Sequence, residues 1–437
     1  MAKKRKRIVT ATTATTTTTI DDMPSDTLLL IIGQLGRSDL PSLSLVSKRF
    51  RSLADRFVRR LTFPKLPIRN STLQKLFSRF SSVNHIVLRC VRIPRVLSAV
   101  LSSALDIEHL EIVGRPTGGY PSFYEQRRMF SLCGRFQKIK ALGLGFCLDK
   151  VEDDDLAQFV QNFPSLQELD LSVPGWTDVR INKLTSKVPN LRKISLCWCD
   201  TMTDTALDSL SANCVNLEEI CFQGWTEFSP EVFCRFLRKA RNLRSVKLPD
   251  FYQSIMQPEL LLLGEAISAC ENLVHLSIQN RLVNDEILGA ISKSRAPLTS
   301  LHMELKKNNE AYSMKGVSAM LCAFPELTQL WIELPYADFY LQDERMSHLV
   351  KSLPRLKDIT VTTHCPMFAT LFSLIGNCHL LECIRLYVWM KHYRESHHEQ
   401  MRRNYSIKRI EIHPDPDKLL KKHLKSICAS VTEWNFK

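Results

Sequence analysis

The amino-acid sequence predicts an α/β fold in which a short helical module precedes a long solenoid of about 13 strand–helix repeats. Two observations lead to this prediction. Residues 23–63 hold apolar side chains at helical spacing, and the rest of the chain repeats one short apolar phrase. With 437 residues, 44% of them hydrophobic, the chain can bury a continuous core along such a solenoid.

The first 22 residues are expected to form a flexible leader. A tract from Thr10 to Thr19 contains only threonine and alanine and shows no periodicity. Before it stands a cluster of five basic residues, Lys3, Lys4, Arg5, Lys6 and Arg7. This cluster predicts nuclear import, and a solubilising tail is the alternative. Residues 1–70 carry 14 Lys and Arg against 5 Asp, a net charge of +9. The whole chain has a net charge of +14, so most of the excess positive charge lies in this N-terminal part.

Residues 23–63 predict three short helices. Pro24 suits a first helical turn, Asp26 favours the helix dipole, and Gly36 is placed to end the helix. Ser38 and Asp39 can cap a second helix over 40–46, and a third is expected over 47–57. About 40 residues rarely fold stably without disulfides, a metal or a partner, so spare apolar surface here indicates a docking site.

The same stretch resembles an F-box, the helical module that binds the Skp-type adaptor of cullin–RING ubiquitin ligases. The resemblance lies in Met23-Pro24-x-Asp26-x-Leu28-x-x-Ile31, Leu35 and the run from Asp39-Leu40 to Leu53. Conservative replacements stand at four positions, Met23, Asp26, Ser47 and Phe50. The resemblance implies that eight apolar side chains contact the adaptor: Pro24, Leu28, Ile31, Leu35, Leu40, Leu43, Val46 and Phe50. A helical cap for the repeats is the alternative.

From residue 64 to 412, one phrase recurs thirteen times: an apolar residue, two residues, an apolar residue, one residue, an apolar residue. The first copy is Val83-Ile86-Leu88, the last is Ile407-Ile410-Ile412, and successive copies are 24 to 32 residues apart. The last two apolar positions point to one face of a short strand. Stacking such units buries a core that no single unit could build.

These repeats resemble a leucine-rich-repeat (LRR) horseshoe. The unit from Cys199 to Ile220 resembles the cysteine-containing subtype, which commonly follows an F-box. After residue 412, the spacing of Leu419, Leu420, Leu424 and Ile427 predicts a capping helix within 413–437.

The fourteen cysteines predict buried thiols rather than disulfides. Cys214, Cys270 and Cys378 each precede a repeat's first leucine position by three residues, where a thiol packs as a small hydrophobe. Cys197 and Cys199 lack the second pair that a zinc site needs. With no apolar run of 18 residues and no signal-peptide core, we expect no membrane span and a location in the nucleus or cytoplasm.

The residue between the last two apolar positions of each phrase should project onto the concave face. These residues mix charge signs from Val87 to Glu411, which argues against bound nucleic acid. In the C-terminal half they include Lys247, His302, Trp331 and Arg385. An exposed aromatic ring among cations predicts a recognition site. The alternative is that Trp331 only covers neighbouring backbone.

The longest repeat contains a loop, residues 114–124, with three aromatic residues, Tyr120, Phe123 and Tyr124. Plant hormone receptors of the F-box/LRR group carry a long loop at a similar place, which makes these three residues candidate ligand contacts. A tolerated insertion is the alternative. Those receptors also hold an inositol phosphate on a dense basic cluster. A small molecule or an inositol phosphate is therefore a further candidate ligand here, although the basic residues of this sequence do not mark out such a cluster.

Enzymatic motifs are missing from the sequence. It has no phosphate-binding glycine loop, no G-x-S-x-G and no H-E-x-x-H. His392, His397 and His398 are spaced poorly for metal ligands on one helix face. We therefore expect neither a cofactor nor a metal ion, and no catalysis by the chain itself.

The F-box and LRR resemblances together imply the substrate-recognition subunit of a Skp–cullin–F-box (SCF) ubiquitin ligase, which leads a target protein to ubiquitination and proteasomal degradation. The F-box would bind the Skp-type adaptor, and through it the cullin core, while the concave face binds a target protein. Two alternatives stay open: a sensor whose target binding needs a small molecule near Trp331, and a scaffold that works without a ligase.

Overall fold

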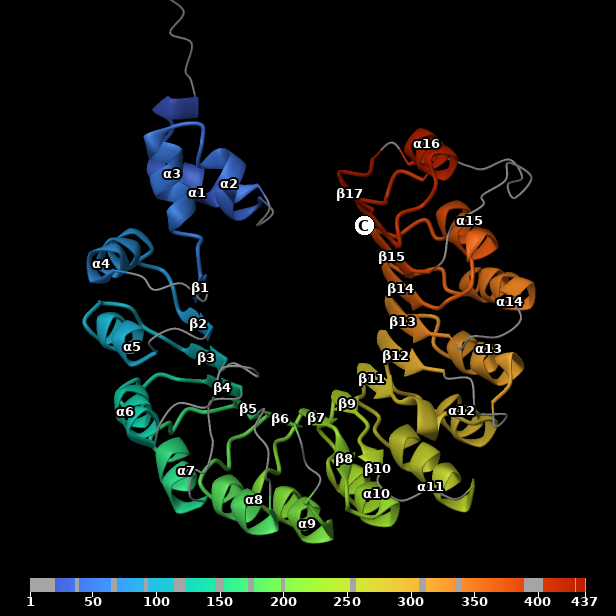
Figure 1. The fold of residues 1–437 in the computed structure, drawn as a ribbon, viewed down its shortest axis with the longest axis horizontal. Coiled ribbons are helices and arrows are strands. Elements are labelled where there is room, and N and C mark those ends of the chain that lie inside the picture. The colour runs from blue at the N-terminus through green and yellow to red at the C-terminus, as the bar shows by residue number, and fades with distance from the viewer. Residues whose placement is uncertain are drawn as a thin grey trace, which may run out of the picture.

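The computed structural model describes most of the chain and shows a horseshoe (Figure 1). Strands line its inner rim, helices form its outer rim, and the N-terminal helical module sits at one tip. The described residues are 20–35, 39–63, 69–89, 93–113, 123–145, 153–171, 177–197, 201–251, 257–305, 312–334, 339–388, 404–428 and 430–436.

The helical module contains the three predicted helices, each shorter than expected. They are α1 (Ser25–Gly33), α2 (Leu40–Leu43) and α3 (Lys48–Asp55), after a 3-10 turn at Ile20–Asp22. Ser47 starts α3 as its N-cap, because its side chain accepts a hydrogen bond from the Phe50 amide. The module has its own small core of Leu28, Ile32, Phe50 and Leu53. Gly36 and Ser38, the predicted helix end and cap, lie outside the described residues.

Fifteen parallel strands form one continuous sheet in chain order, which confirms the α/β solenoid. The strands are β1 (Arg60–Phe63), β2 (His85–Arg89), β3 (His109–Val113), β4 (Ala141–Gly145), β5 (Glu168–Leu171), β6 (Lys193–Cys197), β7 (Glu219–Gln223), β9 (Ser245–Lys247), β11 (His275–Ile278), β12 (Ser300–Glu304), β13 (Gln329–Glu333), β14 (Asp358–Thr362), β15 (Cys383–Tyr387), β16 (Arg409–His413) and β17 (Glu433–Phe436). A separate pair, β8 (Trp225–Thr226) and β10 (Asp250–Phe251), lies beside them.

All thirteen predicted strands are present, and the sheet extends by one strand at each end. β1 pairs with β2 although residues 60–63 fall within the predicted helical module. β17 pairs with β16, so the C-terminal segment adds a strand as well as the predicted capping helix, α16 (Lys418–Ile427).

The helices of the solenoid cover the outer side of the sheet (Figure 1). Besides α16 they are α4 (Asn70–Arg79), α5 (Ile93–Leu101), α6 (Phe123–Cys133), α7 (Asp153–Val160), α8 (Asp178–Thr185), α9 (Asp204–Asn213), α10 (Pro230–Lys239), α11 (Gln257–Ser268), α12 (Asp285–Ile291), α13 (Met314–Cys322), α14 (Phe339–Val350) and α15 (Phe368–Asn377), with a 3-10 turn at Asn280–Leu282. No helix among the described residues is long and apolar enough to span a membrane.

One hydrophobic core runs along the solenoid between strands and helices, from Phe63 to Cys428. The apolar positions of the repeated phrase supply it, since residues such as Leu110 and Ile112 are almost fully buried. Cys214, Cys270 and Cys378 belong to this core as thiols, as the sequence predicts. Burial raises the pKa of Cys214 to about 12 and those of Cys270 and Cys378 to about 11.

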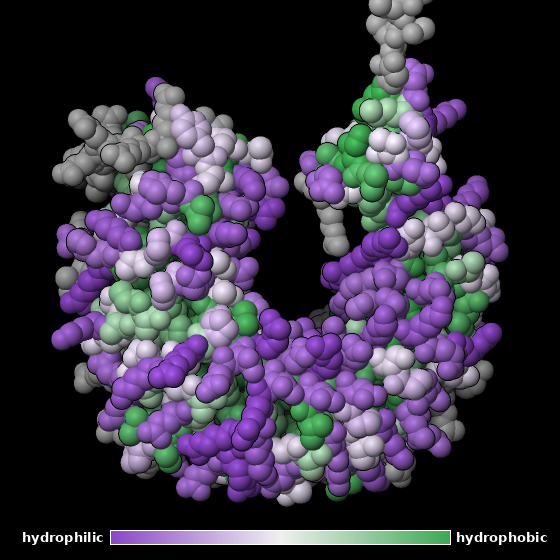
Figure 2. All heavy atoms as spheres, turned by 180° about the vertical axis from the view of Figure 1, so that it is seen from behind, coloured by the Kyte–Doolittle hydropathy of each residue, from purple (hydrophilic) through white to green (hydrophobic). Residues whose placement is uncertain are grey.

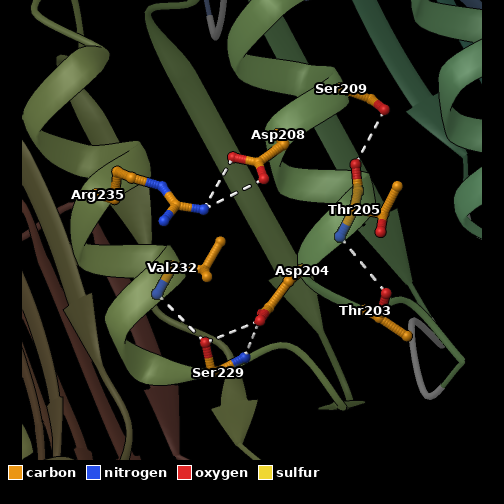
Figure 3. Close-up of polar contacts among 8 residues, drawn as sticks. All are labelled: Thr203, Asp204, Thr205, Asp208, Ser209, Ser229, Val232 and Arg235. Atoms are coloured by element: carbon orange, nitrogen blue, oxygen red, sulfur yellow. Dashed lines mark hydrogen bonds and ion pairs between the residues drawn. The ribbon is translucent and has the colours of Figure 1, made fainter.

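Neighbouring repeats are joined at their helix N-termini by carboxylates (Figure 3). Asp204, the first residue of α9, accepts hydrogen bonds from the amide (2.7 Å) and hydroxyl (3.1 Å) of Ser229, the N-cap of α10. Asp178 and Thr203 repeat this arrangement between α8 and α9. In each pair, one bond satisfies the backbone amide of the N-cap residue, which the helix leaves without an internal partner, and the other holds its hydroxyl. The repeats are thereby fixed in register along their outer edge.

Candidate functional site

The helical module exposes large apolar side chains to solvent. Leu30 and Leu45 are 74% and 79% exposed, and Val46 is 66% exposed. Ile31 and Leu35 are also exposed. In Figure 2, hydrophobic residues gather on this module at the upper right. Exposed apolar side chains concentrated on a module this small indicate a surface that a partner protein covers.

The eight predicted adaptor contacts divide into two groups. Pro24, Ile31, Leu35 and Val46 are exposed, and Leu40 and Leu43 are partly buried against the module's core. Leu28 and Phe50 are only 1% and 3% exposed, so they hold the helices together and cannot present surface to a partner. The sequence prediction is therefore corrected at Leu28 and Phe50.

Leu30 and Leu45 are the most exposed apolar side chains of the module, and both are missing from the predicted contacts. Leu30 lies in a run of apolar residues, Leu28 to Ile32, which on a helix points to every side. Such a run is the signal that could have identified Leu30, because a single buried face cannot accommodate it.

The concave face presents the predicted row of side chains in register. Lys247, Ser277, His302, Trp331, Thr360 and Arg385 are paired one after another from β9 to β15. At about 4.8 Å per strand, Lys247 and Arg385 are separated by roughly 24 Å along the sheet. The four candidate residues of this row therefore do not converge on one small molecule.

Trp331 and His302 form the centre of this row. Their rings stack with centroids 4.4 Å apart at 22°. His302 Nδ1 lies 3.1 Å from the Ser277 hydroxyl, and its Nε2 lies 3.9 Å from a Glu304 carboxylate oxygen. Burial and the nearby Lys247 lower the pKa of His302. Trp331 remains 48% exposed, so part of the indole is open to a binding partner.

Arg385 does not offer an uncompensated charge next to Trp331. Its Nη1 donates a 2.7 Å hydrogen bond to Asp358 on the preceding strand and lies 3.5 Å from the Thr360 hydroxyl. Burial acts to lower the pKa of Arg385, but Asp358 and the other nearby groups raise it overall. The predicted setting of an aromatic ring among cations is thus corrected.

Side chains on the concave face of the sheet carry more negative than positive charge. Nine are acidic and six are basic, a net charge of −3, although the whole chain has +14. The acidic residues are Glu111, Glu168, Asp170, Glu219, Glu304, Glu333, Asp358, Glu411 and Glu433. The basic residues are Arg60, Arg89, Lys193, Lys247, Arg385 and Arg409.

Comparison with known proteins identifies the helical module. Residues 20–62 match the family model described as the F-box domain. The chain therefore contains an F-box. Its boundaries enclose all three helices and reach into β1, so the F-box continues directly into the first strand of the solenoid.

Solved structures of low sequence identity are similar to this chain over most of its length. One is a chain in the crystal structure of the Rad7 and Elc1 complex in yeast, 16% identical with a TM-score of 0.46, over 77% of this chain and 86% of that one. Another is the leucine-rich repeat-containing protein LegL7 from Legionella pneumophila, 13% identical with a TM-score of 0.35, over 75% and 90%. The strand order of the chain itself shows that its F-box is followed by a parallel strand–helix solenoid.

The remaining predicted site residues are only partly described. Phe123 and Tyr124 lie in the first turn of α6, where the structure describes their backbone alone. Tyr120, the Lys3–Arg7 cluster and His392, His397 and His398 lie outside the described residues. Within the part of the chain that is described, no group of three or more His, Cys, Asp or Glu could hold a metal ion.

Proposed function

We propose that this chain is the substrate-recognition subunit of an SCF ubiquitin ligase. The F-box carries the proposal, since residues 20–62 match its family model and expose Leu30, Leu45 and Val46. Covering such side chains with a Skp-type adaptor would stabilise the complex by roughly 1.5–3 kcal/mol for each fully buried one. The cullin core joins through the adaptor.

In this proposal the chain performs no bond chemistry. The solenoid is a rigid arm with a continuous core, and its concave face holds a protein target. Ubiquitin carried by the ligase's catalytic partners then meets the target's lysines at high effective concentration. The role of the chain is positioning, which agrees with its enzymatic motifs being absent from the sequence.

The test is co-expression of the full chain with a Skp-type adaptor, followed by co-purification. Replacing two exposed F-box residues, Leu30→Asp with Leu45→Asp, should abolish adaptor binding and leave the solenoid folded. The matched control, Val215→Asp with Leu380→Asp, changes two exposed apolar residues on the solenoid, 67% and 48% exposed, and should bind normally.

Binding that survives the F-box double substitution would place the interface elsewhere. A wild-type chain that brings down no adaptor would refute the ligase function and favour the scaffold alternative. Leu28→Asp is not a substitute for this test, because a charge at a 1% exposed position would unfold the F-box itself.

In this proposal the target protein binds the concave face directly, without a small molecule between them. Lys247, His302, Trp331 and Arg385 follow one row across six strands and do not surround a common pocket. Nuclear import through Lys3–Arg7 remains a prediction. Replacing these five residues with alanine in a fluorescent fusion of the full chain should shift it from the nucleus to the cytoplasm.

A further inference from the structure

The concave face is acidic while the protein as a whole is basic. Much of its positive charge is also neutralised there. Arg60 pairs with Glu111 at 3.2 Å, Lys193 with Glu219 at 2.8 Å, and Arg385 with Asp358 at 2.7 Å. Arg409 pairs with Glu433 in the same way. Five carboxylates and two cations stand outside these four pairs, and four of the five carboxylates lie at two places on the sheet.

The first cluster lies beside the exposed indole of Trp331. Glu304 and Glu333 are paired in register on β12 and β13, two residues beyond His302 and Trp331 on the same face. Within the described residues, the Glu333 carboxylate accepts no hydrogen bond. His302 stacks on the Trp331 ring, and its lowered pKa favours a neutral imidazole. An aromatic ring next to carboxylates attracts a cationic side chain by cation–π and ionic interactions together.

The second cluster borders a hollow above β4. The concave positions of β4 are Ala141, Gly143 and Gly145, none of which has a side chain longer than a methyl group. A hollow of about 180 Å³ results, with Glu168 and Asp170 of β5 among its lining residues. Glu111 lies against it from β3, since a Cβ on Gly143 would stand 3.2 Å from Glu111 Cγ. Lys193, His85 and His109 line the same hollow. Because Glu111 is paired with Arg60 and Lys193 with Glu219, Glu168 and Asp170 give this hollow its net negative charge.

We propose that the concave face binds a basic segment of the target, with lysine or arginine side chains seated at Trp331 and Glu333 and in the hollow above β4. The two positions are seven strand spacings apart, roughly 34 Å along the sheet. This inference rests on the proposed function, because it names the class of target that the ligase arm holds. Charge complementarity decides against an acidic partner.

The test measures binding of two fluorescein-labelled 20-residue peptides to the full chain by fluorescence anisotropy. One peptide alternates lysine and glycine, and the other alternates glutamate and glycine. The lysine peptide should bind and the glutamate peptide should not. The double variant Glu304→Gln with Glu333→Gln should weaken lysine-peptide binding about tenfold, and Trp331→Leu, which keeps apolar bulk but removes the indole, about two- to fivefold.

The matched control is Glu286→Gln with Glu344→Gln, which removes the same charge from exposed positions on helices α12 and α14. It should change the affinity less than twofold. Equal weakening by both double variants would show only non-specific attraction, and would overturn the proposal. Tighter binding of the glutamate peptide, or no binding of either peptide, would also overturn it.

Adaptor co-purification is scored on the same preparations, so the two proposals fail separately. A chain that binds the lysine peptide but no adaptor keeps the basic-target surface and loses the ligase function. A chain that binds the adaptor but no peptide keeps the ligase function and loses the basic-target surface. Circular dichroism of each variant checks that it remains folded.

Discussion

The guanidinium of Arg79 donates two hydrogen bonds to the carboxylate of Asp55, from Nε to Oδ2 at 2.7 Å and from Nη2 to Oδ1 at 2.9 Å. Asp55 is the last residue of F-box helix α3, and Arg79 ends α4, the first helix of the solenoid. The hydrogen bond to Asp55 raises the pKa of Arg79. Two parallel bonds fix an orientation as well as a distance, so the F-box is held in a defined direction relative to the arm.

Breaking this contact should loosen the F-box from the solenoid. Arg79→Met keeps the aliphatic stem and removes both hydrogen bonds, leaving the largely buried Asp55 carboxylate without them. We expect a loss of about 1–2 kcal/mol, since one partner is half exposed. Small-angle X-ray scattering of this variant should show a broader distribution of interatomic distances than that of the wild type. Arg79→Lys keeps the charge but cannot form two parallel hydrogen bonds, so its scattering profile should lie between those of the wild type and Arg79→Met. An unchanged scattering profile for Arg79→Met would show that this contact does not fix the direction of the F-box.

The repeat fold could be predicted from the sequence because its signal is local. A period of two within each phrase places Leu110 and Ile112 inward, and the recurrence of the phrase supplies the solenoid. β1 and β17 were missed although both carry the full phrase, as Val58-Leu61-Phe63 and Val431-Trp434-Phe436. The first copy falls within the predicted helical module, and the second follows the predicted capping helix. β1 and β17 form by pairing with the adjacent strands β2 and β16.

The sites were less predictable, because their properties arise between repeats. Arg385 stands in the predicted row, but its partner Asp358 lies 27 residues earlier, on another strand. The sequence therefore suggests a cation where the structure has an ion pair. In the F-box, Leu28 and Leu30 are equally apolar, and only the packing of three helices decides that one is buried and the other exposed.

The helix-end carboxylates should contribute more to stability than exposed ion pairs on the same helix. Asp204→Ala removes the acceptor for the Ser229 amide and hydroxyl, and should lower the free energy of unfolding by about 1–2 kcal/mol. Asp208→Ala, one turn further along α9, removes only the ion pair with Arg235, whose side chains are both 52% exposed (Figure 3). Its effect should stay within about 0.5 kcal/mol. Urea unfolding of both variants measures the difference, and equal losses would argue against the inter-repeat cap.

Buried thiols should make the solenoid sensitive to alkali. A thiol whose pKa is raised by folding has no unfavourable effect below its ordinary pKa of 9.0, and stability falls as pH rises from there toward the folded value. For Cys214 this window runs from 9.0 to about 12. The free energy of unfolding of Cys214→Ala should therefore decline less steeply between pH 9 and 11 than that of the wild type.

Other groups titrate in the same pH range. The quantity to compare is therefore the slope of the free energy of unfolding against pH in the wild type and in Cys214→Ala. A small cavity left by the alanine lowers stability equally at every pH and does not change the slope. Identical slopes for wild type and Cys214→Ala would mean that the thiol is not desolvated in the folded protein.

Two glycines on neighbouring helices should respond in opposite directions to alanine. Gly264 of α11 is buried against α12, and an added Cβ would stand 2.7 Å from Ala290 Cβ and 3.2 Å from Ile287 Cα. The helices would have to separate, so Gly264→Ala should destabilise the protein by about 1–3 kcal/mol. At the exposed Gly289 of α12 an added Cβ meets nothing within 4 Å.

Gly289→Ala should therefore stabilise the protein by about 0.5–1 kcal/mol, because alanine restricts the unfolded chain and favours the helix. Thermal unfolding of both variants measures the two effects. If Gly264→Ala were also stabilising, the close approach of α11 and α12 would be wrong, since helix propensity favours alanine at both positions and only the packing distinguishes them.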